Sequence, residues 1–507
     1  MDKLKNTKRN IIYGSINKII MLLCPFIIRS IIIKKLGMDY VGLGSLFTSI
    51  LQVLSLAELG FGSAIVYSMY KPIAEEDNKT LSALIYFYRR IYRIIGSIIL
   101  VAGIAVMPLL KYIISGKYPA DINIYILYLI YLVNTVASYF MYAYKQSILM
   151  AYQRNDVDSN ISSIVNMVMY GLQIAALLLT RNYYTYIIFM PVATMAINVY
   201  RNYMVNKMYP HIGCEGEISR DVKKDMYKRV FGLMLTKVCQ VCRNSFDSIV
   251  ISAFLGLTIL GRYQNYYYVI STLIGFLSII SNSIVAGIGN NIVTKSVEEN
   301  YKQYNVFTCA YNWLSSWCTV CLLCLYQPFM NIWIGKKNMF PFALVILMCI
   351  YFYSMKAGDP AAIYKAATGI YWEDRARPVV ESIANLGLNI ILVKTFGVYG
   401  VVVSTIISIV FINIPWSMHV VFKIYFERKP FRNYMIMLIN FVKLCITGAV
   451  TYFLCTLINL DNVYISFILR VIICIVVPNV IIIVLNFKNE DFKLSVKLLK
   501  KMTGTRK

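Results

Sequence analysis

Residues 463–486 read VYISFILRVIICIVVPNVIIIVLN, an apolar run that contains a single charge, Arg470. A helix of about 20 such residues is long enough to cross the hydrocarbon core of a bilayer. Comparable runs recur along the whole chain, and the longest polar stretch between them covers residues 207–229. Hydrophobic residues make up 59% of the 507-residue chain and charged residues only 15%. We therefore predict an all-α polytopic membrane protein.

The apolar runs, divided at glycine, proline, asparagine and charged residues, predict about fourteen transmembrane helices. They cover residues 10–34, 41–70, 83–110, 122–149, 157–180, 183–206, 227–255, 262–294, 305–328, 340–366, 376–395, 399–424, 433–457 and 463–486. The first run follows a basic segment and shows no small-residue cleavage site, so we interpret it as a retained span rather than a signal peptide.

The distribution of positive charge predicts the orientation. If the N-terminus is cytoplasmic, most of the 50 lysines and arginines fall in cytoplasmic segments, as the positive-inside rule requires. The same placement explains the net charge of +26 without nucleic acid as a partner. We expect both termini in the cytoplasm, and the basic tail, with Phe492, Val496 and Leu499 at helical spacing, along the membrane surface.

A constant offset of 219 residues superposes three separated features, which predicts an internal duplication. The matching positions are Leu36-Gly37 with Gly42 on Leu255-Gly256 with Gly261, Lys18 on Lys237, and Ser163 to Asn166 on Ser382 to Asn385. Six spans per copy keep both copies in the same orientation, with a substrate site expected between them. The predicted domains are an N-lobe at 1–215, a C-lobe at 216–430, and a final helix pair with the basic tail at 431–507.

Several predicted spans contain charges, each of which costs about 2.5–3.5 kcal/mol at a span centre. Four of them are basic and lie on the repeat-related spans 1 and 7, where they would line a cavity suited to an anionic, sugar-bearing ligand: Lys18, Arg29, Lys237 and Arg243. The others are Glu58, Asp247, Lys356, Asp359, Glu381, Lys443 and Arg470. Simple pairing is the alternative: Arg243 with Asp247, Lys356 with Asp359, and Glu58 with a base of span 1.

The spacings of several cysteines, such as Cys239 with Cys242, superficially fit metal sites. All twelve cysteines except Cys214 lie in apolar segments, including the row Cys318, Cys321 and Cys324. Without a nearby histidine we interpret them as packing residues, and expect no metal. The two histidines, His211 and His419, lie far apart in sequence, so no catalytic residue is predicted.

Several motifs carry a family resemblance. The chain contains SLAELGFGSAI at 55–65, with PFIIR at 25–29, YVGL at 40–43, YKQSILMA at 144–151 and FGVYG at 396–400. These stretches resemble the polysaccharide-transporter (Wzx-type) branch of the multidrug/oligosaccharidyl-lipid/polysaccharide (MOP) exporter superfamily, along essentially the whole chain.

The resemblance implies a fold like that of MATE transporters and the flippase MurJ, and alternating access in the bacterial inner membrane. It implies flipping of undecaprenyl-pyrophosphate-linked oligosaccharide for O-antigen, capsule or exopolysaccharide, with membrane lipids, a polymerase and glycosyltransferases as partners. The residues matching the family's basic cavity are Lys18, Arg29, Lys237 and Arg243. Coupling to Na⁺ or H⁺, without another cofactor, would use Asp247, Glu381, Asn385 and Thr405.

Two other functions remain open from the sequence. A cation-coupled multidrug exporter of the same superfamily would use acidic residues to hold its ion or drug, and span 1 has none. A membrane enzyme of polysaccharide assembly would show a large outward loop or a catalytic intramembrane histidine. The predicted loops are short and His419 stands in no recognisable motif, so the flippase is favoured.

Overall fold

A computed structural model describes residues 3–58, 61–458 and 460–502. Within these ranges it describes every side chain except those of residues 3–8, 11, 57, 63, 221–222, 224–237, 240, 244, 282–283, 286 and 498–502. The described chain is built from helices and contains no strand. It divides into two compact units, Met1–Gln264 and Asn265–Lys507, and each is described separately below.

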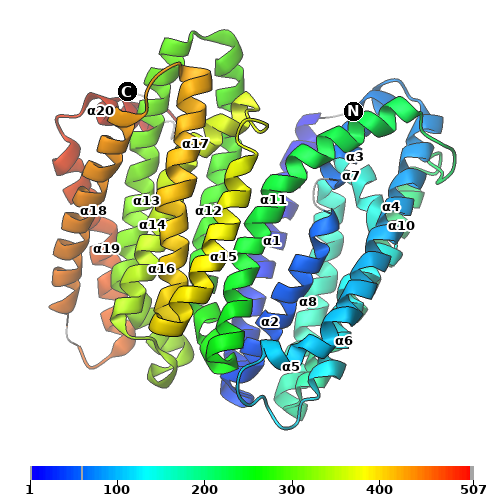
Figure 1. The fold of residues 1–507 in the computed structure, drawn as a ribbon, viewed down its shortest axis with the longest axis horizontal. Coiled ribbons are helices and arrows are strands. Elements are labelled where there is room, and N and C mark those ends of the chain that lie inside the picture. Colours follow the sequence, from blue (N-terminus) through cyan, green and yellow to red (C-terminus); the bar gives the residue numbers. More distant parts are fainter. Residues whose placement is uncertain (1–2, 59–60, 459, 503–507) are drawn as a thin grey trace. The chain divides into compact units, whose positions relative to one another are not determined.

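The first unit is a bundle of helices joined by short turns (Figure 1). Its helices are α1 (Lys3–Lys35), α2 (Met38–Leu54), α3 (Phe61–Ala74), α4 (Asn78–Val106), α5 (Leu110–Ile113), α6 (Ile124–Phe140), α7 (Gln146–Ala151), α8 (Asn155–Thr180), α9 (Tyr183–Ile187), α10 (Phe189–Met208), α11 (Arg220–Leu255) and the first turns of α12 (Leu257–Thr294). In this unit α1 packs along α8, and α11 packs against α2.

The second unit contains the rest of α12 and the helices that follow (Figure 1). They are α13 (Val297–Ile334), α14 (Phe342–Thr368), α15 (Ala376–Phe396), α16 (Val398–Ser408), α17 (Ile414–Val421), α18 (Phe431–Thr456), α19 (Val463–Asn486) and α20 (Glu490–Met502). Two π-helical segments flank α17. Ile409–Asn413 joins α17 to α16, and Phe422–Phe426 follows α17, so that one continuous helix runs from α16 to Phe426.

Polar caps start several of these helices as the sequence dictates. Asp77 accepts the backbone N–H of Thr80 at 2.9 Å at the start of α4, and Asn462 caps α19. At the start of α13, Ser296 and Glu299 form a reciprocal capping box. These side chains satisfy N–H groups that have no partner inside the helix.

Each of the fourteen predicted segments coincides with a helix or with consecutive short helices. Among the described residues, nine helices are long and apolar enough to cross a membrane, or ten if the bent pair α6 and α7 forms one span. The chain is thus a multi-pass membrane protein, whereas the full count of fourteen crossings stays a prediction. The predicted lobes were defined by the sequence repeat, whereas the two units are defined by compactness. The lobes therefore also stay a prediction.

The last two spans form a hairpin against α13 in the second unit (Figure 1). The apolar window of α19 has a mean hydropathy of 2.9 but is only 17% buried. Its large exposed side chains, such as Ile468, Ile472 and Val476, face outward, where lipid replaces protein as the apolar surrounding. The tail forms helix α20 as predicted, and Phe492 packs on Trp313 of α13 with ring centroids 5.1 Å apart.

Candidate functional site

Arg29 of α1 is half-buried within the first unit and lies near three tyrosines. Its Nη1 donates to the carbonyl of Gln264 at 3.3 Å. Its charge interacts with the hydroxyls of Tyr131, Tyr183 and Tyr186. The hydroxyls of Tyr131 and Tyr183 lie 3.1 Å apart, and both rings are buried. A guanidinium among hydroxyl donors is an arrangement suited to phosphate or carboxylate oxygens.

The other three basic candidates differ in their surroundings. Lys18 projects from α1 as an exposed side chain. The side chain of Lys237 lies outside the part of the structure that is described. Arg243 is buried on α11, with 9% of its surface exposed. Whether Lys18 and Lys237 meet in one cavity therefore stays a prediction.

Arg243 and Asp247 stand one turn apart on α11, and both are buried. Serines of the same helix link it to its neighbours in the first unit. Ser245 donates to the side-chain oxygen of Gln52 on α2 at 3.5 Å. Ser248 accepts from the side chain of Gln264 at 2.7 Å. The polar face of α11 is thus turned into the unit rather than toward lipid.

Glu58 has a different environment from the one expected. Among the described residues its partners are two tyrosine hydroxyls, not a base of α1. Tyr139 of α6 donates to Oε2 at 2.6 Å, and Tyr92 of α4 donates to Oε1. Two hydroxyl donors satisfy a half-buried carboxylate without a neighbouring positive charge.

In the second unit, amide and hydroxyl groups of α15 and α16 form a buried ladder. Asn385 donates through Nδ2 to Oγ1 of Thr405 at 3.1 Å, and Asn389 donates to Oδ1 of Asn385 at 3.3 Å. Ser404 donates to Oδ1 of Asn389. No more than 2% of the surface of any of these four side chains is exposed. The structure therefore brings together Asn385 and Thr405, two of the predicted ion-coupling residues.

Glu381, another of these residues, lies one turn before Asn385 and forms an ion pair with Arg377. Its Oε2 accepts from Nη1 of Arg377 at 3.0 Å and from Nδ2 of Asn413 at 2.6 Å. Asn413 ends the π-helical segment that precedes Pro415. Pro415 has no N–H to continue the regular helical bonding, and π-segments are frequent at functional sites.

Lys356 and Asp359 form the ion pair that their spacing of three residues suggested. The distance between Lys356 Nζ and Asp359 Oδ2 is 2.6 Å. Tyr311 of α13 donates to the same carboxylate. Lys356 is only 3% exposed, so its positive charge is neutralised by Asp359 inside the second unit.

The charges of the last two spans contact only their own hairpin in the bonds described. Lys443 of α18 donates to the side-chain oxygen of Asn486 on α19 at 2.7 Å. Arg470 of α19 donates to the carbonyl of Ile458 at 3.1 Å. These bonds join the two helices and the turn between them.

Sequence reasoning missed a buried ion network between α14 and α15. Asp374 accepts from Lys365 and from Nε of Arg377, the latter at 2.9 Å. All three side chains are buried. The first unit has a similar network at the start of α8, where Asp156 pairs with Arg154 at 2.9 Å and Arg9 at 3.1 Å. Asp374 stood in a polar joint, and Lys365 and Arg377 at the ends of predicted spans, where a sequence gives no sign of burial.

His419 lines an open pocket of about 460 Å³ in the second unit, bounded mainly by apolar groups. Its neighbours there include Trp416, Pro415 and Tyr434. No carboxylate lines this pocket to orient the imidazole. The surroundings therefore give His419 no catalytic partner among the lining residues.

The arrangement of helices is similar to that of solved MurJ and MATE transporter structures. The chain is similar to the lipid II flippase MurJ in its inward closed conformation, with a TM-score of 0.66 and 16% identity, covering 94% of this chain and 99% of that one. It is also similar to an inward-facing multidrug resistance MATE family transporter, with a TM-score of 0.59 and 15% identity, covering 81% of this chain and 98% of that one.

A third similar structure is a MOP superfamily transporter from Pyrococcus furiosus described as having a binding pocket of reverse polarity. It has a TM-score of 0.53 and 14% identity, and the match covers 84% of this chain and 97% of that one. No protein-family model and no curated protein sequence matches the chain. At these identities the likeness establishes the fold.

Proposed function

We propose that this protein is a flippase that moves a lipid-linked oligosaccharide from the cytoplasmic to the outer leaflet by alternating access. The observation that carries the proposal is the half-buried Arg29, which bonds the carbonyl of Gln264 and whose charge acts on three tyrosines of the first unit. A cation within a membrane-spanning segment is expensive and is usually functional. A pyrophosphate-linked sugar would supply both the anion and the hydroxyls that such a site can bind.

The extent of the fold supports the same proposal. The MurJ structure covers 94% of the chain, whereas the MATE transporter covers 81% although almost all of its own length is matched. Another MATE structure covers 89% of the chain, so the chain extends beyond both MATE structures. In our proposal the hairpin of α18 and α19 carries the lipid tail. No bond of the substrate is made or broken, so the protein acts as a transporter rather than an enzyme.

We further propose that Lys18, Lys237 and Arg243 act with Arg29 on the anionic headgroup. The substrate would be an undecaprenyl-pyrophosphate-linked repeat unit, made by glycosyltransferases and passed on to a polymerase. The protein would lie in the bacterial inner membrane with both termini in the cytoplasm, as the distribution of lysine and arginine favours.

Alanine substitution tests the basic site. Purified variants Lys18→Ala, Arg29→Ala, Lys237→Ala and Arg243→Ala would be compared in proteoliposomes that report flipping of the lipid-linked sugar. We expect a loss of about tenfold or more for Arg29→Ala, since about 1.4 kcal/mol of lost binding is tenfold. Lys71→Ala is the matched control, because Lys71 is 82% exposed on α3. Full flipping by all four variants would exclude the basic-site mechanism.

Ion coupling is a second part of the proposal, supported by the ladder around Asn385. Amide and hydroxyl oxygens are the ligands that hard cations such as Na⁺ prefer. Asn385 and Thr405 supply such oxygens at buried positions, and Asp247 is a further buried carboxylate on α11. Glu381 already binds Arg377 and Asn413, so its proposed role is to orient this region.

A cation-coupled multidrug exporter is the second candidate, favoured by the match to the MATE transporter. Its carboxylates would be the half-buried Glu58 and the buried Asp247 and Glu381. Expression in a drug-sensitised host discriminates the two functions. A raised resistance to cationic drugs, together with no flipping of lipid-linked sugar in liposomes, would favour export of drugs over the flippase.

A further inference from the structure

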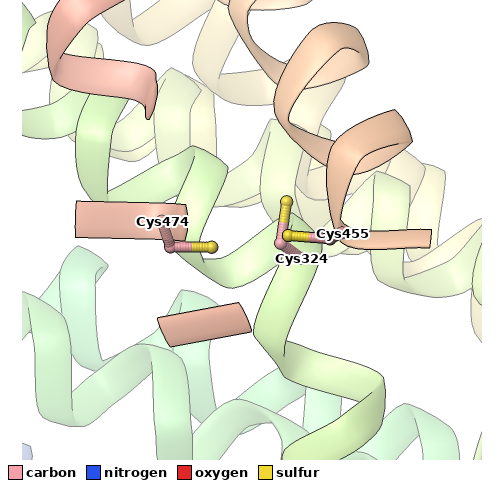
Figure 2. A group of neighbouring side chains, drawn as sticks. All are labelled: Cys324, Cys455 and Cys474. Atoms are coloured by element: carbon pink, nitrogen blue, oxygen red, sulfur yellow. The ribbon is translucent and has the colours of Figure 1, made fainter. Parts of the chain in front are cut away.

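Three cysteines from three different helices meet inside the second unit. They are Cys324 of α13, Cys455 of α18 and Cys474 of α19, and each is at most 2% exposed. Their Sγ atoms all lie within 4.8 Å of one another, and Figure 2 shows the three side chains as close neighbours, with the sulfurs of Cys455 and Cys474 directed toward each other. Nothing in the sequence indicates this group, because its members come from three different helices and share no motif.

The surroundings of the three thiols are apolar and fixed. Val320, Tyr353 and Leu444 belong to the same buried cluster. Two groups of α13 bond the carbonyl of Cys474: Nε1 of Trp317 at 2.9 Å and Sγ of Cys321 at 3.7 Å. These bonds fix the axial position of α19 relative to α13. The position of Cys474 is therefore fixed by its backbone, and the thiol of Cys324 hydrogen-bonds to those of Cys455 and Cys474.

A positive charge with a spare donor lies beside the group. Arg470 stands one turn before Cys474 on α19, and its charge interacts with the Cys455 thiol. Its Nη2 donates to the carbonyl of Ile458 at 3.1 Å. Its Nε is buried and has no hydrogen-bond partner among the described residues. An unsatisfied guanidinium N–H is costly unless an anionic acceptor forms nearby.

We propose that Cys324, Cys455 and Cys474 form a binding site for a thiophilic divalent metal ion of the zinc class. Zinc–sulfur bonds are about 2.3 Å long, which places three thiolates bound to one ion about 4 Å apart. The observed separation is within reach of that value by small side-chain rotations. Thiolate ligands select soft or borderline ions, whereas Mg²⁺, Ca²⁺ and Na⁺ prefer oxygen.

The charges of the proposed site balance inside the apolar core. Each thiol loses its proton to solvent when its sulfur binds the ion, so three protons are released for one metal ion. Three thiolates and one divalent ion leave a net charge of −1. The Arg470 guanidinium supplies the opposite charge and a hydrogen-bond donor. The bound ion would join α13, α18 and α19, and this inference does not depend on the proposed flippase function.

Metal binding to the purified, reduced full-length protein tests the inference. The protein is first treated with a chelator and then titrated with Zn²⁺ against a chromogenic competitor, and separately with Cd²⁺ to detect the thiolate–metal absorption band. We expect one ion per chain and a thiolate band. A monodisperse protein that shows no saturable binding and no thiolate band would overturn the proposal, whatever the variants do.

Single substitutions locate the site. Cys324→Ser, Cys455→Ser and Cys474→Ser should each weaken Zn²⁺ binding at least tenfold. Cys445→Ser is the matched control, since Cys445 lies on α18 but is exposed, and it should bind as the unchanged protein does. If a serine variant fails to run as a monodisperse species, the corresponding alanine variant replaces it. Equal binding by all four variants would contradict the assignment.

Variants of Arg470 distinguish a metal site from three cysteines that only pack together. Arg470→Gln removes the charge and should weaken Zn²⁺ binding about 10- to 100-fold, the usual effect of losing a group that supports metal ligands. Arg470→Lys keeps the charge and should retain most of the affinity. Mass spectrometry of the unreduced protein tests for the contrary outcome. A disulfide between any two of the three cysteines would overturn the metal site.

Discussion

Gly42 and Gly261, which are 219 residues apart in the sequence, lie against each other in the first unit. A Cβ atom on Gly261 would be 3.2 Å from the backbone nitrogen of Gly42 and 2.4 Å from the carbonyl oxygen of Met38. A Cβ atom on Gly42 would be 2.2 Å from the carbonyl oxygen of Leu257. Thr258 donates to Asp39, again across 219 residues. The offset found in the sequence is thus also the offset of a reciprocal contact.

Substitution of either glycine should force α2 and α12 apart. For Gly42→Ala and Gly261→Ala we expect a loss of about 1–3 kcal/mol of stability or failure to fold, because the added methyl group meets rigid backbone. Thermal unfolding of the purified protein in detergent, and the yield of monodisperse protein, measure the effect.

Gly171→Ala is the control for this pair. Gly171 lies within α8, and nothing lies within 4 Å of a Cβ atom there. Alanine in a helix interior is favoured over glycine by roughly 0.5–1 kcal/mol, so this variant should be unchanged or slightly more stable. A Gly42→Ala protein as stable as the control would show that the close contact is absent.

The buried network around Asp374 should dominate the stability of the α14–α15 connection. Asp374→Asn removes the carboxylate that Lys365 and Arg377 share. We expect a loss of about 3–5 kcal/mol, the usual effect of leaving a buried charge without its partner. Chemical denaturation followed by tryptophan fluorescence would measure it. The neighbouring exposed Glu373, changed to Gln, should stay within about 0.5 kcal/mol.

The ladder of α15 and α16 should carry the ion dependence of transport. In Asn385→Ala and Thr405→Val proteins, we expect flipping that no longer responds to replacing Na⁺ by K⁺, or to a pH gradient if H⁺ is the coupling ion. Thr395→Val on the same α15 is the control, because the Thr395 hydroxyl bonds only a local carbonyl and is exposed. Unchanged ion dependence in both ladder variants would place coupling elsewhere.

The kind of cation at position 29 should matter as well as its charge. Arg29→Lys keeps a point charge but loses the planar fork that matches phosphate oxygens. We expect it to retain part of the flipping activity, whereas Arg29→Gln should lose about tenfold or more. Initial rates at several substrate concentrations would separate weaker binding from slower transport. Equal rates for the Lys and Gln variants would show that the positive charge at position 29 does not contribute to flipping.

The sequence alone determined the helical segments of this protein, but not all of their boundaries: α13 begins at Val297 rather than at residue 305, and α11 at Arg220 rather than at residue 227. Apolar length is a local property, and a run such as residues 463–486 forms a helix because its backbone must bond internally in lipid. The pairing of Lys356 with Asp359 was also local, since three residues make one helical turn.

Only the tertiary structure decided which distant side chains meet. Glu58 binds Tyr92 and Tyr139, and Cys324 meets Cys455 and Cys474, although nothing in their spacing indicates it. Such contacts depend on the rotation and height of each helix against its neighbours. Close packing at small residues sets these two quantities, and hydrophobicity along one helix does not report them.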